Sequence, residues 1–199
     1  NDRILDLAGN NQISEDGGNN SITTGAGNDS IYSGTGNDVI RAGDGNNLIS
    51  DSGGRSRITT GAGDDIIITY SGDENDVIQA GAGNDHIYSG GGQDKVDAGA
   101  GDDFVDATLA KGSIISGGRG DDRLTLSTVA TAATANGVSG FETLLLSGHD
   151  MSQDMRVFKR NLSFSTLATS EFAASFTNVG AGITNYFASM SGEGASISR

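Results

Sequence analysis

A branched aliphatic residue recurs every nine residues through most of the first 126 residues. The series runs Ile4, Ile13, Ile22, Ile31, Ile40, Ile49, Ile58 and Ile67. Two extra residues enter near Tyr70, and the series resumes at Ile78, Ile87, Val96 and Val105, then after a second irregularity at Ile115 and Leu124. Nine is the period of neither an α-helix nor a coiled coil, so the chain is predicted to be a stacked repeat structure.

The period predicts a six-residue turn followed by a three-residue strand whose middle residue points inward. Two turns and two strands then form one coil of about 18 residues, and stacked coils form two parallel sheets around a thin aliphatic core. A glycine commonly stands four residues before the inward residue, as Gly27, Gly83 and Gly101 do. Tight turns of this kind need positive φ or close backbone approach, which glycine provides with the least strain.

The position two residues before each inward aliphatic is acidic or amidic in nearly every repeat. It holds Asp2, Asn11, Asn20, Asp29, Asp38, Asn47, Ser56, Asp65, Asp76, Asp85, Asp94, Asp103, Ser113 and Asp122. Stacking would place like positions about 4.8 Å apart, where bare carboxylates repel and raise one another's pKa. A hard cation with oxygen ligands, Ca²⁺ rather than Mg²⁺, fits this column. Softer metals are disfavoured because the chain has no Cys and only two His.

The nonapeptide Gly-Gly-x-Gly-x-Asp-x-(aliphatic)-x resembles the repeat of the RTX family. Good copies begin at Gly25, Gly81, Gly90 and Gly118, and the resemblance covers roughly residues 1–126. The resemblance implies an all-β fold, a right-handed parallel β-roll that binds several Ca²⁺ ions. In that family each ion lies between a turn and the turn one coil further on.

The resemblance thereby implies candidate calcium ligands in the turns. They are the carboxylates of Asp29, Asp38, Asp65, Asp76, Asp85, Asp94, Asp103 and Asp122, and the carbonyl groups of Gly81, Gly83, Gly99, Gly101, Gly118 and Gly120. One edge would pair Asp65 with Asp85, Asp85 with Asp103, and Asp103 with Asp122; the other would pair Asp76 with Asp94. Asn and Ser replace the carboxylate in several N-terminal turns, so residues 9–24 and 45–60 are predicted to be mainly metal-free.

After Leu126 the period disappears, and two regions are expected: a β-roll over 1–126 and a β-rich region over 127–199 that caps or continues it. Residues 140–146 are predicted to form a buried strand. This segment, Gly-Phe-Glu-Thr-Leu-Leu-Leu, is also similar to stretches that follow RTX repeats in calcium-dependent bacterial surface-layer proteins.

Composition excludes several functions. The net charge of −14 argues against nucleic acid and anionic membranes as partners, and no apolar run is long enough to span a bilayer. No catalytic motif is present, so no catalytic residue is assigned and an enzyme is not expected. The chain begins with neither an initiator Met nor a signal segment, and we expect it to be part of a longer protein.

Two functions remain open. The first is a calcium-binding structural segment of a secreted bacterial cell-surface protein, a surface-layer (S-layer) component or adhesin that folds and assembles outside the cell. Its expected partners are calcium, other copies of itself or a cell-surface glycan. The second is the calcium-dependent secretion and folding module of a larger secreted enzyme or toxin. For either, the resemblance implies export by a one-step type I route.

Overall fold

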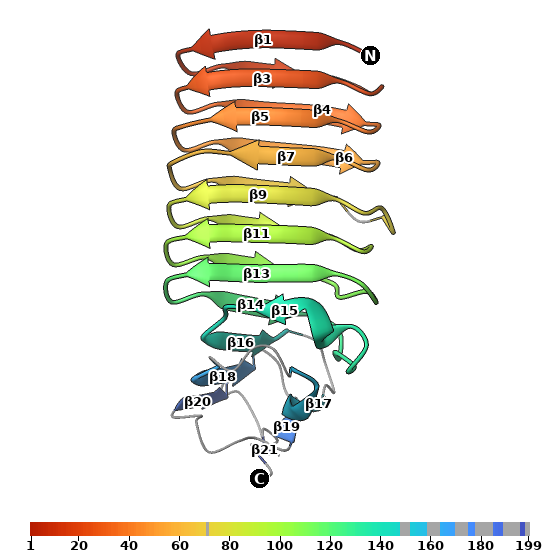
Figure 1. The fold of residues 1–199 in the computed structure, drawn as a ribbon, viewed down its shortest axis with the longest axis vertical. Helices are drawn as coiled ribbons and strands as arrows, with labels where there is room; N and C mark the ends of the chain where they lie inside the picture. The colour runs from red at the N-terminus through yellow and green to blue at the C-terminus, as the bar shows by residue number, and fades with distance from the viewer. Residues whose placement is uncertain are drawn as a thin grey trace.

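The computed structural model describes residues 1–70, 72–147, 152–158, 164–169, 175–177, 185–188 and 196–197. Within them, two long parallel sheets face each other, and through the repeats the chain alternates between them strand by strand, so that each coil adds one strand to each sheet (Figure 1). The eight-stranded sheet contains β1 (Arg3–Ala8), β3 (Ser21–Ala26), β5 (Val39–Gly43), β7 (Arg57–Thr60), β9 (Val77–Ala82), β11 (Lys95–Ala100), β13 (Ile114–Arg119) and β15 (Val138–Ser139). The ten-stranded sheet contains β2 (Gln12–Ser14), β4 (Ser30–Thr35), β6 (Leu48–Gly53), β8 (Ile66–Thr69), β10 (His86–Tyr88), β12 (Phe104–Asp106), β14 (Arg123–Leu126), β16 (Thr143–Leu146), β18 (Thr166–Thr169) and β20 (Asn185–Ala188). The predicted parallel β-roll is therefore confirmed.

The aliphatic series sets the register of both sheets. Ile31 pairs with Ile49 and Ile49 with Ile67, each one coil of 18 residues further along the chain. Where two residues are inserted, Ile58 pairs with Ile78, so the insertion widens the turn before β9 and leaves the stack in phase. Glu74 in that turn is exposed. Register is kept because a shift by one residue would turn every inward side chain to solvent.

The core is one column of aliphatic residues from each sheet. From Ile22 to Ile87 each inward isoleucine is fully buried, whereas Ile4 on the first coil is only partly buried. The prediction of three-residue strands was too short for many coils, because several strands run to six residues. A second inward position therefore follows the aliphatic by two residues. It holds small or polar residues such as Thr24, whose hydroxyl donates to the Ala42 carbonyl (2.6 Å).

The sheets extend past residue 126. Strand β16 pairs in register with β14, with Leu144 opposite Leu124. Strands β18 and β20 follow in the same ten-stranded sheet. A third parallel sheet of β17 (Ser152–Asp154), β19 (Ser175–Thr177) and β21 (Ser196–Ile197) lies at the C-terminal end (Figure 1). Short 3-10 helices span Ala135–Gly137 and Met155–Val157. The division between residues 126 and 127 stays a prediction.

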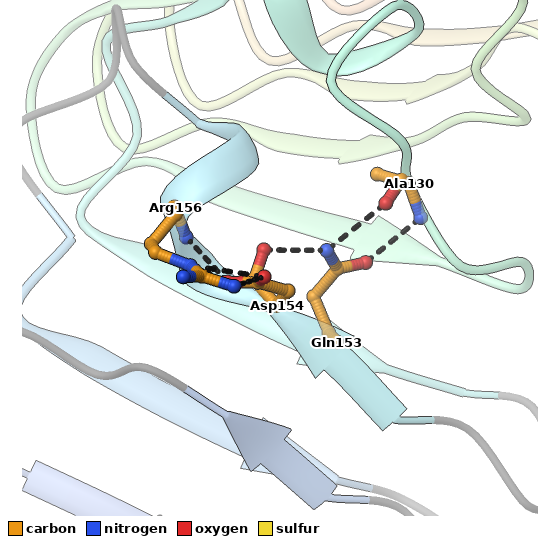
Figure 2. A network of polar contacts seen from close by, with 4 residues as sticks. All are labelled: Ala130, Gln153, Asp154 and Arg156. Carbon is orange, nitrogen blue, oxygen red and sulfur yellow. Dashed lines mark hydrogen bonds and ion pairs between the residues drawn. The ribbon is translucent and has the colours of Figure 1, made fainter. Parts of the chain in front are cut away.

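Aromatic and amide side chains fill this C-terminal part. Phe141 and Phe176 are fully buried, and Phe158 packs edge-to-face on Phe164 with ring centroids 5.3 Å apart. Figure 2 shows the buried Gln153 side chain bonded to both backbone groups of Ala130, as a neighbouring strand would be (2.8 and 3.1 Å). These contacts attach the segment after β14 to β17. No helix among the described residues is long and apolar enough to cross a membrane.

Glycine in the turns is required by close approach between coils. Gly83 has a φ of +130°, and a Cβ there would lie 2.2 Å from the Gly63 carbonyl oxygen of the preceding coil. Gly53 has nearly the same φ, +137°, but a Cβ there would meet nothing within 4 Å. Substitutions at Gly53 and Gly83 therefore separate the cost of a positive φ from the cost of a collision between coils.

We expect Gly53→Ala to lower the free energy of unfolding by about 1–2 kcal/mol, the cost of positive φ for an L-residue. Gly83→Ala should cost about 1–3 kcal/mol more, because the added methyl also collides with backbone. Denaturant unfolding of both variants in saturating calcium measures the difference. Equal losses would show that the coils can move apart freely, contrary to this account.

Candidate metal centre

The turn carboxylates form a hydrogen-bonded ladder along each edge of the roll. Each carboxylate accepts, through Oδ1, the backbone N–H of the like residue in the preceding coil. On one edge the N–H of Asp65 donates to Asp85 (2.9 Å), that of Asp85 to Asp103 (2.8 Å) and that of Asp103 to Asp122 (2.8 Å). On the other edge the Asp76 N–H donates to Asp94 (3.0 Å). The structure thus brings together the pairs that the sequence predicted.

The two N-terminal candidates join the same ladders through uncharged neighbours. The Asp29 N–H donates to Asn47 Oδ1 (3.0 Å), and the Asp38 N–H donates to Ser56 Oγ (3.1 Å). In these turns a second carboxylate is missing at the like position one coil further on.

A second, exposed ladder runs beside the first in the opposite direction. It uses the residue just before the turn carboxylate. The N–H of Asp102 donates to Asn84 Oδ1 in the preceding coil (2.8 Å), and that of Asp121 donates to Asp102 Oδ1 (2.9 Å). The sequence analysis missed this role, although the frequent Asn-Asp, Asn-Asn and Asp-Asp pairs were its signal. Most pairs of neighbouring turns are therefore joined by two such side-chain bonds, one in each ladder.

One oxygen of most inner carboxylates is left without a partner. Oδ2 is buried and makes no hydrogen bond in Asp29, Asp38, Asp65, Asp85, Asp94, Asp103 and Asp122. Within the described residues, the ion pairs involve only the N-terminal amine with Asp2 and Arg156 with Asp154, so no basic group neutralises these carboxylates. A buried, unpaired carboxylate oxygen is costly, and a cation would compensate it.

The asparagine turns show what that oxygen faces. Asn47 accepts with Oδ1 as an aspartate does, and its Nδ2 donates to the carbonyls of Gly45 (2.8 Å) and Gly43 (3.3 Å). Asn11 likewise donates to the Gly9 carbonyl (3.2 Å). An aspartate in the equivalent place presents Oδ2, an acceptor, to a turn rich in carbonyl oxygens. Two groups of hydrogen-bond acceptors that face each other repel unless a positive charge lies between them. In an asparagine turn the amide N–H group carries a partial positive charge and fills this role.

The glycine candidates lie at close contacts between successive coils. A Cβ on Gly101 would lie 2.1 Å from the Gly83 oxygen, and one on Gly120 would lie 2.0 Å from the Gly101 oxygen. Gly99 and Gly118 stand in the same relation to the oxygens of Gly81 and Gly99, at 2.0 Å. The carbonyl of each turn therefore points at the turn of the next coil. Hard oxygen donors of this kind fit Ca²⁺.

No three His, Cys, Asp or Glu side chains converge on one point as a ready-made metal site in the part of the chain that the structure describes. A cation between coils would therefore be held by at most two carboxylates and completed by backbone carbonyl oxygens. Calcium accepts such mixed oxygen sets.

Glu142 extends the inner ladder beyond the predicted ligands. Its Oε2 accepts the Asp122 N–H (2.9 Å), the place that an aspartate takes in earlier coils. The sequence signal was its position two residues before Leu144, which pairs with Leu124. The signal was missed because the inward residue of the intervening strand, Val138, follows Leu124 by 14 residues instead of nine.

His86 is not part of these turns. Its ring lies on the outer face of β10, with centroids 4.2 Å from Phe104 and 5.1 Å from Tyr88. Burial, and next the charge of Arg123, lower its pKa. His149, which the sequence analysis left without a role, lies outside the described residues.

Burial raises the pKa of the inner carboxylates. The pKa of Asp85 and that of Asp94 rise to about 7 and that of Asp103 to about 6, mainly by burial and further by the charges of neighbouring aspartates. Bonds from backbone N–H groups oppose the rise. The pKa values of Asp38, Asp65, Asp76 and Asp122 are also raised, mainly by burial. These groups are ill suited to carry charge without a counter-ion.

The metal-free protein should gain stability in acid. Between the ordinary aspartate pKa of 3.8 and about 7, the folded state binds protons more tightly than the unfolded chain, so stability falls as pH rises through that range. In chelator, circular dichroism should show more β-structure near the lower end of this window than at its upper end. In calcium the trend should reverse, because the ion competes with protons. A chelated protein that loses β-structure as pH falls from about 7 would contradict this.

The RTX calcium-binding nonapeptide repeat model matches the chain in four copies, at residues 16–49, 41–73, 70–105 and 113–127. Together the matches cover more than half of the chain. No curated protein and no solved structure matches it significantly. The nine-residue length of this repeat is the period of the turns, and calcium is a cation that their oxygen donors suit. The chain belongs to the family of proteins built from RTX calcium-binding nonapeptide repeats.

Proposed function

We propose that the chain is a structural segment of a secreted bacterial cell-surface protein, an S-layer component or adhesin, and that calcium completes its fold outside the cell. RTX repeats make it a calcium-binding structural segment of a secreted protein, a fold that is not typically catalytic. The surface role, assembly with other copies or a surface glycan, and export by a type I route are the further steps of the proposal.

One observation carries the calcium dependence. Asparagine turns satisfy their carbonyls with an amide N–H, whereas aspartate turns leave a buried carboxylate oxygen without a donor. The aspartate turns are therefore complete only with a cation. We assign Asp65, Asp76, Asp85, Asp94, Asp103 and Asp122 as its main carboxylate ligands, with Asp29 and Asp38 in weaker sites. Carbonyl groups of Gly81, Gly83, Gly99, Gly101, Gly118 and Gly120 complete the coordination.

Folding is thereby coupled to calcium concentration. With a net charge of −14 and only 35% hydrophobic residues, the ion-free chain favours an extended state. Ion binding that requires the folded turns adds its free energy to folding. Extracellular calcium modules bind at about 10⁻⁴ to 10⁻³ M, so the chain stays open during export and folds afterwards.

Two features favour a surface structural role over the module of an enzyme or toxin. The first coils contain asparagine turns that are bonded without metal, which suits a permanent scaffold. The segment 140–146, which resembles surface-layer sequences, contains β16 and prolongs the sheet rather than ending it.

Asp103→Asn tests the ligand assignment, with Asp102→Asn as matched control. The new amide at position 103 would keep the acceptor for the Asp85 N–H but lose the charge, so the apparent calcium affinity should fall at least about tenfold. Its N–H groups should also satisfy the turn carbonyls, as those of Asn47 do, and raise stability in chelator. An amide at the exposed position 102 is like the native Asn84 in the preceding coil, so neither the calcium affinity nor the stability in chelator should change much.

A calcium titration followed by circular dichroism measures both variants against the parent chain. The parent should lose β-signal in chelator and regain it with Ca²⁺ but not with Mg²⁺. Equal effects of the two substitutions would refute the ligand assignment, and an unchanged parent spectrum in chelator would refute calcium-dependent folding.

Electron microscopy distinguishes the surface role from the enzyme module. We expect the intact secreted protein that contains this chain to form sheets or filaments in millimolar calcium and to disperse when calcium is chelated. A soluble monomer with a separate catalytic domain in both conditions would favour the enzyme or toxin module instead.

A further inference from the structure

Asp51 is a buried aspartate outside the repeat's carboxylate position. Every other buried aspartate among the described residues occupies the turn position two before an inward aliphatic. Asp51 instead follows Ile49 by two residues in β6 and points into the core, with no exposed surface. Its counterparts on the two neighbouring coils of the same sheet are the uncharged residues Ser33 and Thr69.

This unusual aspartate lies in the strand that precedes the turn lacking the usual one. The turn after β6 has Ser56 where an aspartate is expected, and Ser56 cannot supply a charge. Its hydroxyl accepts the Asp38 N–H (3.1 Å) and donates to the Gly36 carbonyl (3.4 Å). The carboxylate is thus absent from the turn and present in the strand that precedes it.

The side chain of Asp51 is only half satisfied. The Ser33 hydroxyl donates to Oδ1 (2.9 Å), while Oδ2 is buried and has no partner. The pairing of β4 with β6 shifts register here, so that Asp51 lies opposite Gly34. Neither ion pair found among the described residues involves this carboxylate.

Two other carboxylates flank Asp51 along this edge. Burial raises its pKa to about 6, the hydroxyls of Ser56 and Ser33 oppose the rise, and the charges of Asp76 and then Asp38 add to it. Asp76 belongs to the next coil, where its Oδ1 accepts the Ser56 N–H (2.8 Å). Like charges on both sides and an unsatisfied buried oxygen make a cation the natural counterpart.

The Ser113 turn shows that serine at this position does not itself require such an aspartate. Ser113 lies on the same edge and donates to the Gly92 carbonyl (3.2 Å), but the residue corresponding to Asp51 is the buried Ala107. The acidic residue therefore accompanies one serine turn and not the other. A purely structural need of the turn does not account for it.

We propose that Asp51 is a calcium ligand that replaces the missing aspartate at position 56, in a site shared with Asp76 and completed by turn carbonyl oxygens. This inference rests on the proposed calcium binding and revises the expectation that residues 45–60 are mainly metal-free. It adds a site between coils in the part of the roll where the repeat pattern alone predicts none.

Asp51→Asn tests the site in the full chain, and Asp6→Asn is the matched control. Asp6 holds the same repeat position in the first coil but is exposed. Native mass spectrometry should find one bound calcium fewer in Asp51→Asn than in the parent, and no change in Asp6→Asn. The substituted amide keeps the acceptor for Ser33, so the β-structure that remains in chelator, measured by circular dichroism, should equal or exceed that of the parent. Only the thermal stability in calcium should fall.

The double variant Asp51→Asn with Ser56→Asp returns the carboxylate to the usual position and should regain the lost ion. A calcium count unchanged by Asp51→Asn would overturn the proposal, as would a loss of the β-structure that remains in chelator. A double variant that still binds one calcium fewer than the parent would refute the proposal that Asp51 replaces an aspartate at position 56. If the parent chain itself binds no calcium, the proposed function fails, and the Asp51 site fails with it.

Discussion

A buried carboxylate with one oxygen bonded and the other facing carbonyl groups is the constraint on which this structure depends. The bonded oxygen fixes the distance and register between coils, because it accepts a backbone N–H from the coil before it. The other oxygen has no partner from the protein among the described residues. Close stacking is what buries the isoleucine columns, and the same stacking crowds the acidic turns. The cohesion of the core and the repulsion of the turns are thus two results of one geometry.

Asparagine and aspartate resolve this conflict differently along the chain. An asparagine turn is complete by itself, since its amide bonds to the carbonyls of its own turn. An aspartate turn needs an external charge. The first coils contain most of the asparagine turns and the later coils most of the paired aspartates, so the two ends of the roll are expected to differ in their dependence on calcium. Such a gradient would let an N-terminal part hold partial order on which later coils stack as ions bind.

The C-terminal region keeps the same stacking at first but uses different residues for it. Glu142 takes the place of a turn aspartate, and Leu144 that of the inward isoleucine. Beyond them, buried phenylalanines and the Gln153 amide replace the ladder of identical turns. A stack whose repeats give way gradually to a packed aromatic end avoids an abrupt open edge of unpaired strands.

The sequence by itself determined the period, the inward residues, the positions of glycine and the turns that hold carboxylates, because a repeat of nine places each of these without knowledge of any distant contact. It also predicted which aspartates become neighbours, since pairing follows from the coil length. Strand length was underestimated, because small residues at the second inward position give no hydrophobic signal. Only the tertiary structure decided the opposite directions of the two side-chain ladders, the difference between an amide that donates and a carboxylate oxygen that cannot, and the places of Asp51 and Glu142. These depend on which atoms face each other across 18 or 20 residues, and a side chain outside the regular pattern reveals its neighbours only when the coils are stacked.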